Sequence, residues 1–228
     1  MADYWILIAA SGCVAEGVFI AFEYAKKPAA ALILKSIASL LFVLLGFACL
    51  SISADALFAG LVVAGLVLGA AGDVLLNLRV LAGNAAQKIF MAGIAAFLLG
   101  HLLYIAALLG RGADALWIGV PVCAALSAAL LPFAILKRIE ISGKMKVFGI
   151  IYVVLVFLMA GCAAGLLFLR VLNVGLLLFA FGAALFALSD VILTFHLFGR
   201  KKHKLFRALN LSAYYAGQIL IALSLLYI

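Results

Sequence analysis

The sequence has 228 residues, of which 70% are hydrophobic and only 11% are charged, and its mean hydropathy is +1.41. A water-soluble domain of this length needs far more polar side chains to cover its surface, so that class is excluded. The formal net charge is +8. The basic residues nevertheless stand in short clusters between apolar runs, so we exclude a nucleic acid as a partner.

Apolar runs of bilayer-spanning length follow one another along the chain. Because backbone groups in lipid must be satisfied within their own segment, we predict a transmembrane helix in each run. The eight predicted helices span residues 4–24, 30–51, 56–77, 87–109, 115–136, 147–169, 172–197 and 206–228. The first run has no small-residue cleavage site, so we expect a retained helix there. With only short connections, residues 1–228 are expected to form a single domain of an all-α membrane protein.

Lysine and arginine are distributed unevenly between the loops. Thirteen of the 16 lie between helices 1 and 2, 3 and 4, 5 and 6, or 7 and 8, whereas only Arg111 and Arg170 lie in the other loops. The sixteenth, Lys35, lies inside the second run. The positive-inside rule therefore places the odd-numbered loops in the cytoplasm and both termini on the non-cytoplasmic side. The expected location is the inner membrane of a bacterium.

The two halves of the chain resemble each other at an offset of 117 residues, which superimposes residues 72–76 on residues 189–193. The polar positions that coincide are the pairs Asp73 and Asp190, His101 and Gln218, and Lys35 and Tyr152. Four helices per unit predict a parallel 4+4 repeat, with the two aspartates at matched depth beside a pseudo-twofold axis along the membrane normal. Chance similarity between leucine-rich helices is the alternative.

Few polar side chains fall inside the predicted helices, and insertion scales give each charged one a cost of roughly 2.5–3.5 kcal/mol. Such groups usually face a partner or a cavity. At about 1.5 Å per residue, most of them lie roughly 6–18 Å below the cytoplasmic surface, where one cleft would join them. The candidate site residues are Glu16, Lys35, Asp73, His101, Tyr104, Tyr152, Asp190, Tyr214, Tyr215 and Gln218.

These residue types favour acid–base chemistry without a cofactor. Only one histidine lies deep, and the sequence has no HxxxH or HExxH pair for a metal and no GxSxG motif for a serine nucleophile. Two carboxylates in a low-dielectric site repel each other. One of Asp73 and Asp190 is therefore expected to hold its proton while the other ionises.

Structural roles are the alternatives for the same residues. Either aspartate would cap a helix break or pair with Lys35 to hold the bundle. Lys35 itself would snorkel to the interface, and His101 would be a hydrogen-bonded packing residue. The main rival function is a small proton-coupled transporter, because a parallel repeat with intramembrane ionisable groups suits transport as well. A ceramidase-like amidase needs a histidine-rich zinc site, which the sequence lacks, and a purely structural role is the third alternative.

The motifs resemble those of the lysoplasmalogenase family of membrane proteins, also called the YhhN-like family. The resemblance rests on Gly72-Asp73-x-x-Leu76, His101-Leu102-Leu103-Tyr104, Ser189-Asp190 and Tyr214-Tyr215-Ala216-Gly217-Gln218, together with the eight-helix layout. Lys35 is similar to the lysine of the family's second helix, which is usually followed by proline, whereas Ser36 follows here.

This resemblance implies a hydrolase without cofactors that cleaves the vinyl ether bond of lysoplasmalogens. The products are a fatty aldehyde and glycerophosphocholine or glycerophosphoethanolamine. We hypothesise that one of Asp73 and Asp190 is the general acid, that the other stabilises the cation and activates water, and that His101 orients water or relays protons.

Substrate binding is assigned to the remaining candidates. Lys35 is expected to bind the phosphate, and Tyr215 and Gln218 the glycerol oxygens. The expected partners are a lysophospholipid substrate and membrane lipids, and the oligomeric state stays open.

Overall fold

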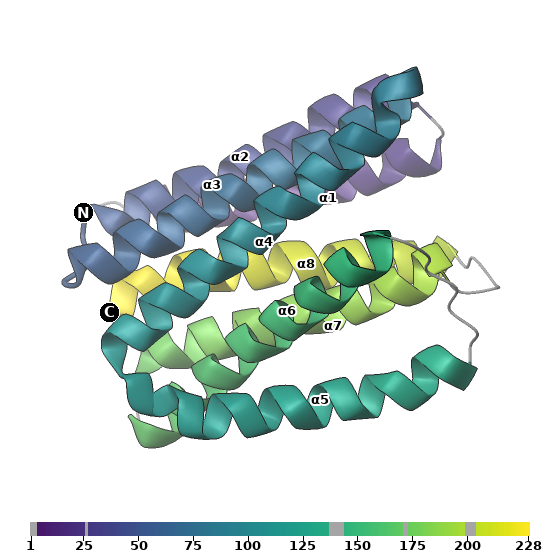
Figure 1. Cartoon of the computed structure of the whole chain (residues 1–228). Coiled ribbons are helices and arrows are strands. Elements are labelled where there is room, and N and C mark those ends of the chain that lie inside the picture. Colours follow the sequence, from purple (N-terminus) through teal and green to yellow (C-terminus); the bar gives the residue numbers. More distant parts are fainter. Residues whose placement is uncertain (1–3, 26, 137–143, 171–172, 199–203) are drawn as a thin grey trace.

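The computed structural model describes residues 4–25, 27–136, 144–170, 173–198 and 204–228 (Figure 1). Within these residues the chain forms eight long helices and no strand. They are α1 (Tyr4–Tyr24), α2 (Pro28–Leu50), α3 (Ala56–Leu78), α4 (Ala86–Arg111), α5 (Leu116–Leu136), α6 (Lys144–Leu169), α7 (Val174–Phe198) and α8 (Lys204–Ser224).

The predicted all-α architecture is confirmed, because each of these eight helices in the described part is long and apolar enough to cross a membrane. The predicted helix boundaries agree closely with the observed ones. The largest difference is at the last helix, which was expected to reach residue 228 but ends at Ser224 and continues as a short 3₁₀ turn, Leu225–Tyr227. A second 3₁₀ turn, Arg79–Leu81, follows α3 directly.

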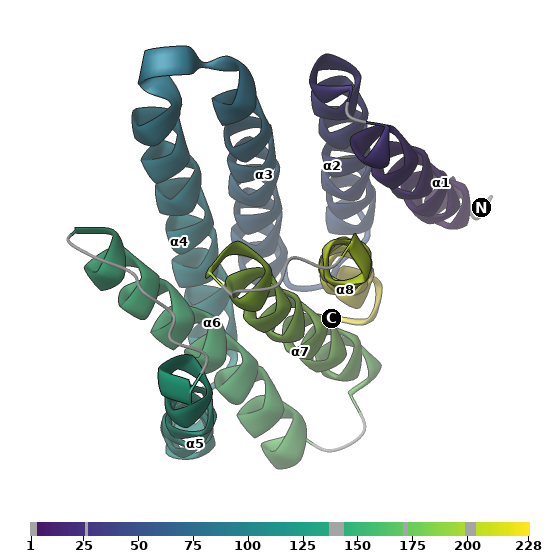
Figure 2. The ribbon, with the colours of Figure 1, turned by 90° about the vertical axis from the view of Figure 1, so that its right-hand side faces the viewer.

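Helices that are neighbours in sequence pack as pairs: α1 with α2, α3 with α4, α5 with α6, and α7 with α8 (Figure 2). Helix α8 lies near the centre and also packs against α1, α2 and α3. The two termini lie at one end of the bundle (Figure 1). We call the opposite end, where α3 ends and α8 begins, the basic end. Which side of the membrane it faces stays a prediction.

Asp55 lies at the end of the bundle where the two termini lie, which we call the terminal end. Its carboxylate caps α3 by accepting a hydrogen bond from the backbone N–H of Phe58 at 3.0 Å. The same side chain holds Arg111, the last residue of α4, at 2.8 Å. These hydrogen bonds, the one from Phe58 first, lower the pKa of Asp55. One carboxylate thus ties the start of α3 to the end of α4.

Glycines set close helix crossings in both halves. A Cβ atom added at Gly100 would lie 3.2 Å from the carbonyl oxygen of Gly65, and one added at Gly217 would lie 2.8 Å from that of Gly182. The second pair is the first pair moved by the 117-residue offset. The contacts of α2 with α8 and of α6 with α4 also correspond. These are the contacts expected of a 4+4 repeat, which itself stays a prediction.

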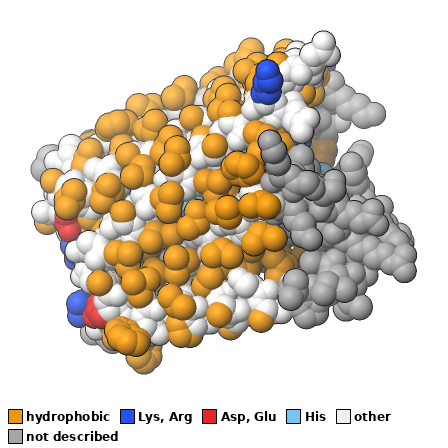
Figure 3. Space-filling view, viewed as in Figure 1, with side chains coloured by type: hydrophobic (Ala, Val, Ile, Leu, Met, Phe, Trp, Pro, Cys, Tyr) orange, Lys and Arg blue, Asp and Glu red, His pale blue; other side chains and the backbone are white. Residues whose placement is uncertain are grey.

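The outer surface is apolar. Large hydrophobic side chains such as Leu7, Leu57 and Trp117 are strongly exposed. In Figure 3 hydrophobic side chains cover the middle of the visible face, and the charged side chains seen among the described residues lie toward its ends. Only lipid makes such a surface stable, because water would drive it to associate. The chain is therefore an integral, multi-pass membrane protein.

We expect Gly182→Ala to lower the melting temperature of the purified protein in detergent. The new Cβ would lie 2.7 Å from the carbonyl oxygen of Gly217, and overpacking of this kind costs about 1–3 kcal/mol. Gly60→Ala is the matched control, since nothing lies within 4 Å of its Cβ position and alanine favours a helix by about 1 kcal/mol. Equal melting temperatures for the two variants would contradict the proposed tight crossing.

Candidate active site

Asp73 is the centre of a buried polar cluster. Its side chain is 3% exposed, and Oδ1 lies 2.9 Å from the Lys35 ammonium. Oδ2 accepts hydrogen bonds from Ser39 Oγ at 2.7 Å and from the Tyr214 hydroxyl at 2.8 Å. With Tyr215, these residues form what we call the Asp73 cluster. A cation and two hydroxyl donors together offset the cost of burying the carboxylate charge.

Helical spacing brings this cluster together. Lys35 and Ser39 are four residues apart on α2 and so share one face, which packs against α3 and α8. The Tyr215 hydroxyl lies 3.1 Å from Ser39 Oγ and donates a longer bond, 3.4 Å, to the Lys35 carbonyl oxygen. The Lys35 side chain therefore points to Asp73 and not to the membrane surface, and it is only 5% exposed.

A hydrogen-bond chain extends the cluster to α4. The Tyr104 hydroxyl donates to Gln218 Oε1 at 3.0 Å, and Gln218 Nε2 donates to the Tyr214 hydroxyl at 3.2 Å. Glu16 is buried on the other flank, where it lies against Ser212 of α8. Gln218 and Tyr214 are four residues apart and so lie on one face of the central helix α8. This face contacts the Asp73 carboxylate through the Tyr214 hydroxyl.

Asp190 has a different setting. It lies buried on α7, and Oδ2 accepts a hydrogen bond from the Tyr152 hydroxyl of α6 at 2.7 Å. Thr194 Oγ1 donates to the Asp190 backbone carbonyl one turn away. Within the described ranges no lysine or arginine forms an ion pair with Asp190. We call Tyr152 and Asp190 the Asp190 pair.

His101 lies between the two groups. Its Nδ1–H donates to the Phe97 carbonyl at 2.7 Å, because a carbonyl only accepts. In the neutral ring Nε2 is then an acceptor, and this buried atom has no hydrogen-bond partner among the described residues. The ring packs edge-on against Phe186, 4.7 Å between centroids, and against Tyr152 at 5.4 Å. An unsatisfied buried acceptor marks a position where a water or a ligand would bind.

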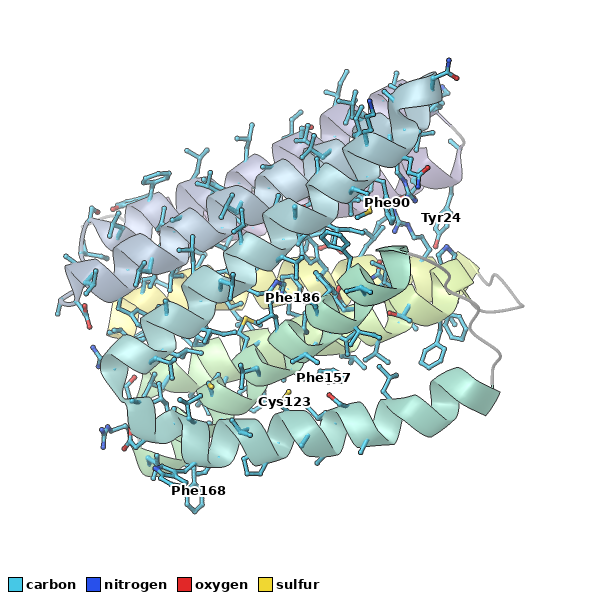
Figure 4. The ribbon with its side chains drawn as sticks, viewed as in Figure 1. Tyr24, Phe90, Cys123, Phe157, Phe168 and Phe186 are labelled. Carbon is cyan, nitrogen blue, oxygen red and sulfur yellow. The ribbon has the colours of Figure 1, made fainter. Side chains whose placement is uncertain are left out.

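Aromatic rings connect the two groups. Phe186, seen in the middle of the bundle in Figure 4, packs against His101, with 4.7 Å between ring centroids, and against Tyr214, with 5.2 Å between them. Sequence analysis placed the polar residues along one cleft. The structure arranges them as two groups joined by rings, because Lys35 and Tyr152 each hold one aspartate in its own half.

Two residues of this arrangement escaped the sequence analysis. Ser39 is fully buried and bonds both Asp73 and Tyr215. Its position four residues after Lys35 on one helix face was an available signal. Phe186 carries no polar atom, so the sequence held no sign that it would pack against both His101 and Tyr214. In the part of the chain that the structure describes, no three His, Cys, Asp or Glu side chains converge as metal ligands.

Comparison with protein families gives a match over most of the chain. The model of the YhhN family matches residues 24–225, a range that holds the Asp73 cluster, His101 and the Asp190 pair. No curated protein and no solved structure matches the sequence.

We expect Lys35→Met to destabilise the protein strongly, because it leaves Asp73 as an unpaired charge in a buried site. Breaking a buried pair in this way costs about 3–5 kcal/mol, which a thermal melt in detergent would detect. The double variant Lys35→Met/Asp73→Asn removes both charges and should regain most of the lost stability. If the double variant melted no higher than Lys35→Met, the ion pair would not be the source of the loss.

Proposed function

Since this chain belongs to the YhhN family, which includes lysoplasmalogenases, we propose that it is a lysoplasmalogenase-like ether hydrolase of a bacterial inner membrane. The proposed reaction converts a lysoplasmalogen and water to a fatty aldehyde and glycerophosphocholine or glycerophosphoethanolamine. The observation that carries the proposal is the unequal setting of the two buried aspartates. Asp73 is paired with a lysine, whereas Asp190 is bound by a phenol.

This inequality supports a division of roles between the acids. Burial without a cation favours the neutral form of a carboxyl group, and a neighbouring ammonium favours the anion. We therefore assign Asp190 as the general acid and Asp73 as the carboxylate. The Tyr152 hydroxyl occupies Oδ2 of Asp190 and so directs the proton to Oδ1. Pairs of acids with separated environments are the usual basis of acid–base catalysis at neutral pH.

The chemistry then takes three steps. Asp190 donates its proton to the vinyl carbon distal to the ether oxygen, and the carbon next to that oxygen becomes an oxocarbenium ion. Water adds to this carbon and returns a proton to the Asp190 carboxylate, which leaves a hemiacetal. The hemiacetal C–O bond to glycerol breaks, the hydroxyl proton passes to the glycerol oxygen, and the aldehyde leaves. The anionic Asp73 stabilises the positive charge of the oxocarbenium ion electrostatically.

The remaining candidates position the reactants in this scheme. The free Nε2 acceptor of His101, beside Tyr152, would hold the attacking water. Tyr215, which bonds Ser39, and Gln218, which donates to the Tyr214 hydroxyl, would hold glycerol oxygens. Lys35 holds the Asp73 carboxylate in place, since its ammonium forms an ion pair with that group at 2.9 Å. Tyr104 and Tyr214 fix the Gln218 amide from both sides.

We expect Asp190→Asn to reduce aldehyde release from lysoplasmalogen by about 10²-fold or more, since an amide cannot donate the catalytic proton. The assay is product analysis with purified protein in detergent, and a melting curve checks folding. Asp114→Asn is the control, because this acid pairs with Arg170 at 3.5 Å at the terminal end and is 41% exposed. Near-normal turnover by a folded Asp190→Asn variant would overturn the assignment.

The same assay tests the reaction class. An ordinary ester-linked lysophospholipid has no vinyl ether to protonate, so we expect it to give no aldehyde and no other product. If the purified wild-type protein left lysoplasmalogen intact as well, the rival transport function would be favoured, because a transporter does no chemistry on its cargo.

A further inference from the structure

Two arginines lie near the basic end of the bundle. Arg79 follows the last turn of α3, and its guanidinium lies over the Phe90 ring of α4, 4.4 Å from the centroid. Figure 4 shows Phe90 at this end. Arg79 is only partly exposed, and among the described residues no carboxylate forms an ion pair with it. The ring holds the guanidinium in place without neutralising its charge.

Arg207, in the first turn of α8, is held by a single carboxylate. Its Nε donates to Glu23 Oε1 of α1 at 2.8 Å, and both side chains are largely buried. The bond engages Nε, so the terminal nitrogens of the guanidinium retain donors for a second acceptor. The other oxygen of Glu23, Oε2, is buried without a hydrogen-bond partner in the described part of the structure. The Glu23 carboxylate is therefore incompletely satisfied among the described residues.

Arg79 follows α3 and Arg207 lies in the first turn of α8, and these two helices pack against each other. Among the described residues, one carboxylate, Glu23, forms an ion pair with Arg207 and none with Arg79. These partly buried cations therefore leave an excess of positive charge. Such an excess is unfavourable where water is scarce, and a bound anion would relieve it.

The depth of the arginines fits a lipid headgroup. Arg79 is six residues beyond Asp73 on the way to the basic end, and Arg207 is seven residues from Tyr214 in the same direction. At 1.5 Å per residue, both lie about 9–11 Å along the helices from the Asp73–Tyr214 hydrogen bond. Tyr215 and Gln218, to which the glycerol oxygens are assigned, adjoin that bond, so the arginines lie between the proposed glycerol position and the basic end.

We infer that Arg79 and Arg207 together bind the phosphodiester of a lysophospholipid headgroup, and that Glu23 holds Arg207 when the site is empty. The inference deepens the proposed function and rests on it for the identity of the lipid. Arginine suits this role because its planar fork donates two parallel hydrogen bonds to phosphate oxygens. Glu23 competes with the phosphate for Arg207, so it sets the affinity.

The test measures binding of an ester-linked lysophosphatidylethanolamine, which the proposed reaction does not cleave, to the full-length protein in detergent. The readout is the ligand-induced rise in melting temperature over a titration. We expect Arg79→Gln and Arg207→Gln each to weaken binding by about tenfold or more, the effect of losing a charge-assisted hydrogen bond. A monoacylglycerol of the same chain length should bind all variants equally. Arg170→Gln is the control, as this exposed arginine lies at the terminal end.

Glu23→Gln separates a binding role from a structural one. If Glu23 competes with the phosphate, this variant binds the lysophospholipid more tightly than the wild type. If the Glu23–Arg207 pair only holds α1 to α8, Glu23→Gln and Arg207→Gln behave alike, and the inference fails. It fails too if monoacylglycerol binding falls with phospholipid binding. If inorganic phosphate raised the melting temperature with the same arginine dependence, and lysophosphatidylethanolamine raised it no more than monoacylglycerol does, the ligand would be a soluble anion and the lipid assignment would be overturned.

These outcomes are independent of catalysis. An enzyme that releases aldehyde but whose lipid affinity ignores Arg79 and Arg207 refutes the phosphate site alone. Arginine-dependent lipid binding by a protein that releases no aldehyde refutes the proposed reaction and leaves the site in place.

Discussion

The ion pair between Lys35 and Asp73 is the interaction on which the interior depends. Two charges buried between α2 and α3 are tolerable only as a closely spaced pair, and here they lie 2.9 Å apart. Ser39 and Tyr214 complete the coordination of the carboxylate, which draws α8 against α2 and α3. Among lipid-covered helices little hydrophobic force holds the bundle together, so specific polar contacts of this kind and close packing set its geometry.

At positions 117 residues apart, the two halves of the chain carry different side chains beside their aspartates. Helices α2 and α3 pair a lysine with Asp73, whereas α6 and α7 pair a phenol with Asp190. The Gly65–Gly100 and Gly182–Gly217 crossings give both halves the same packing frame. Lys35 gives Asp73 a counter-ion, whereas Tyr152 gives Asp190 a neutral partner. Under the proposed function, this difference is what assigns one aspartate as the anion and the other as the proton donor.

The sequence predicted the helices well because the bilayer imposes a length and an apolar composition on each span. It also selected the residues of the interior, since a charge inside a membrane demands a partner. It did not predict how these residues divide into two groups. The two groups are connected through Phe186, which packs against both His101 and Tyr214, and such an apolar ring looks like any other in a leucine-rich helix. Nor did the sequence predict the contact of Ser39 on α2 with Tyr215 on α8.

The central place of α8 has a consequence for how the protein is made. Tyr214 and Gln218 come from the last of the eight helices to leave the ribosome, yet they complete contacts of α3 and α4. Until α8 inserts, the carboxylate on α3 lacks its phenol and Tyr104 lacks its amide partner. The polar contacts of the interior are therefore completed only after the eighth helix has been synthesised. Until then, the earlier helices lack the hydrogen bonds that α8 supplies.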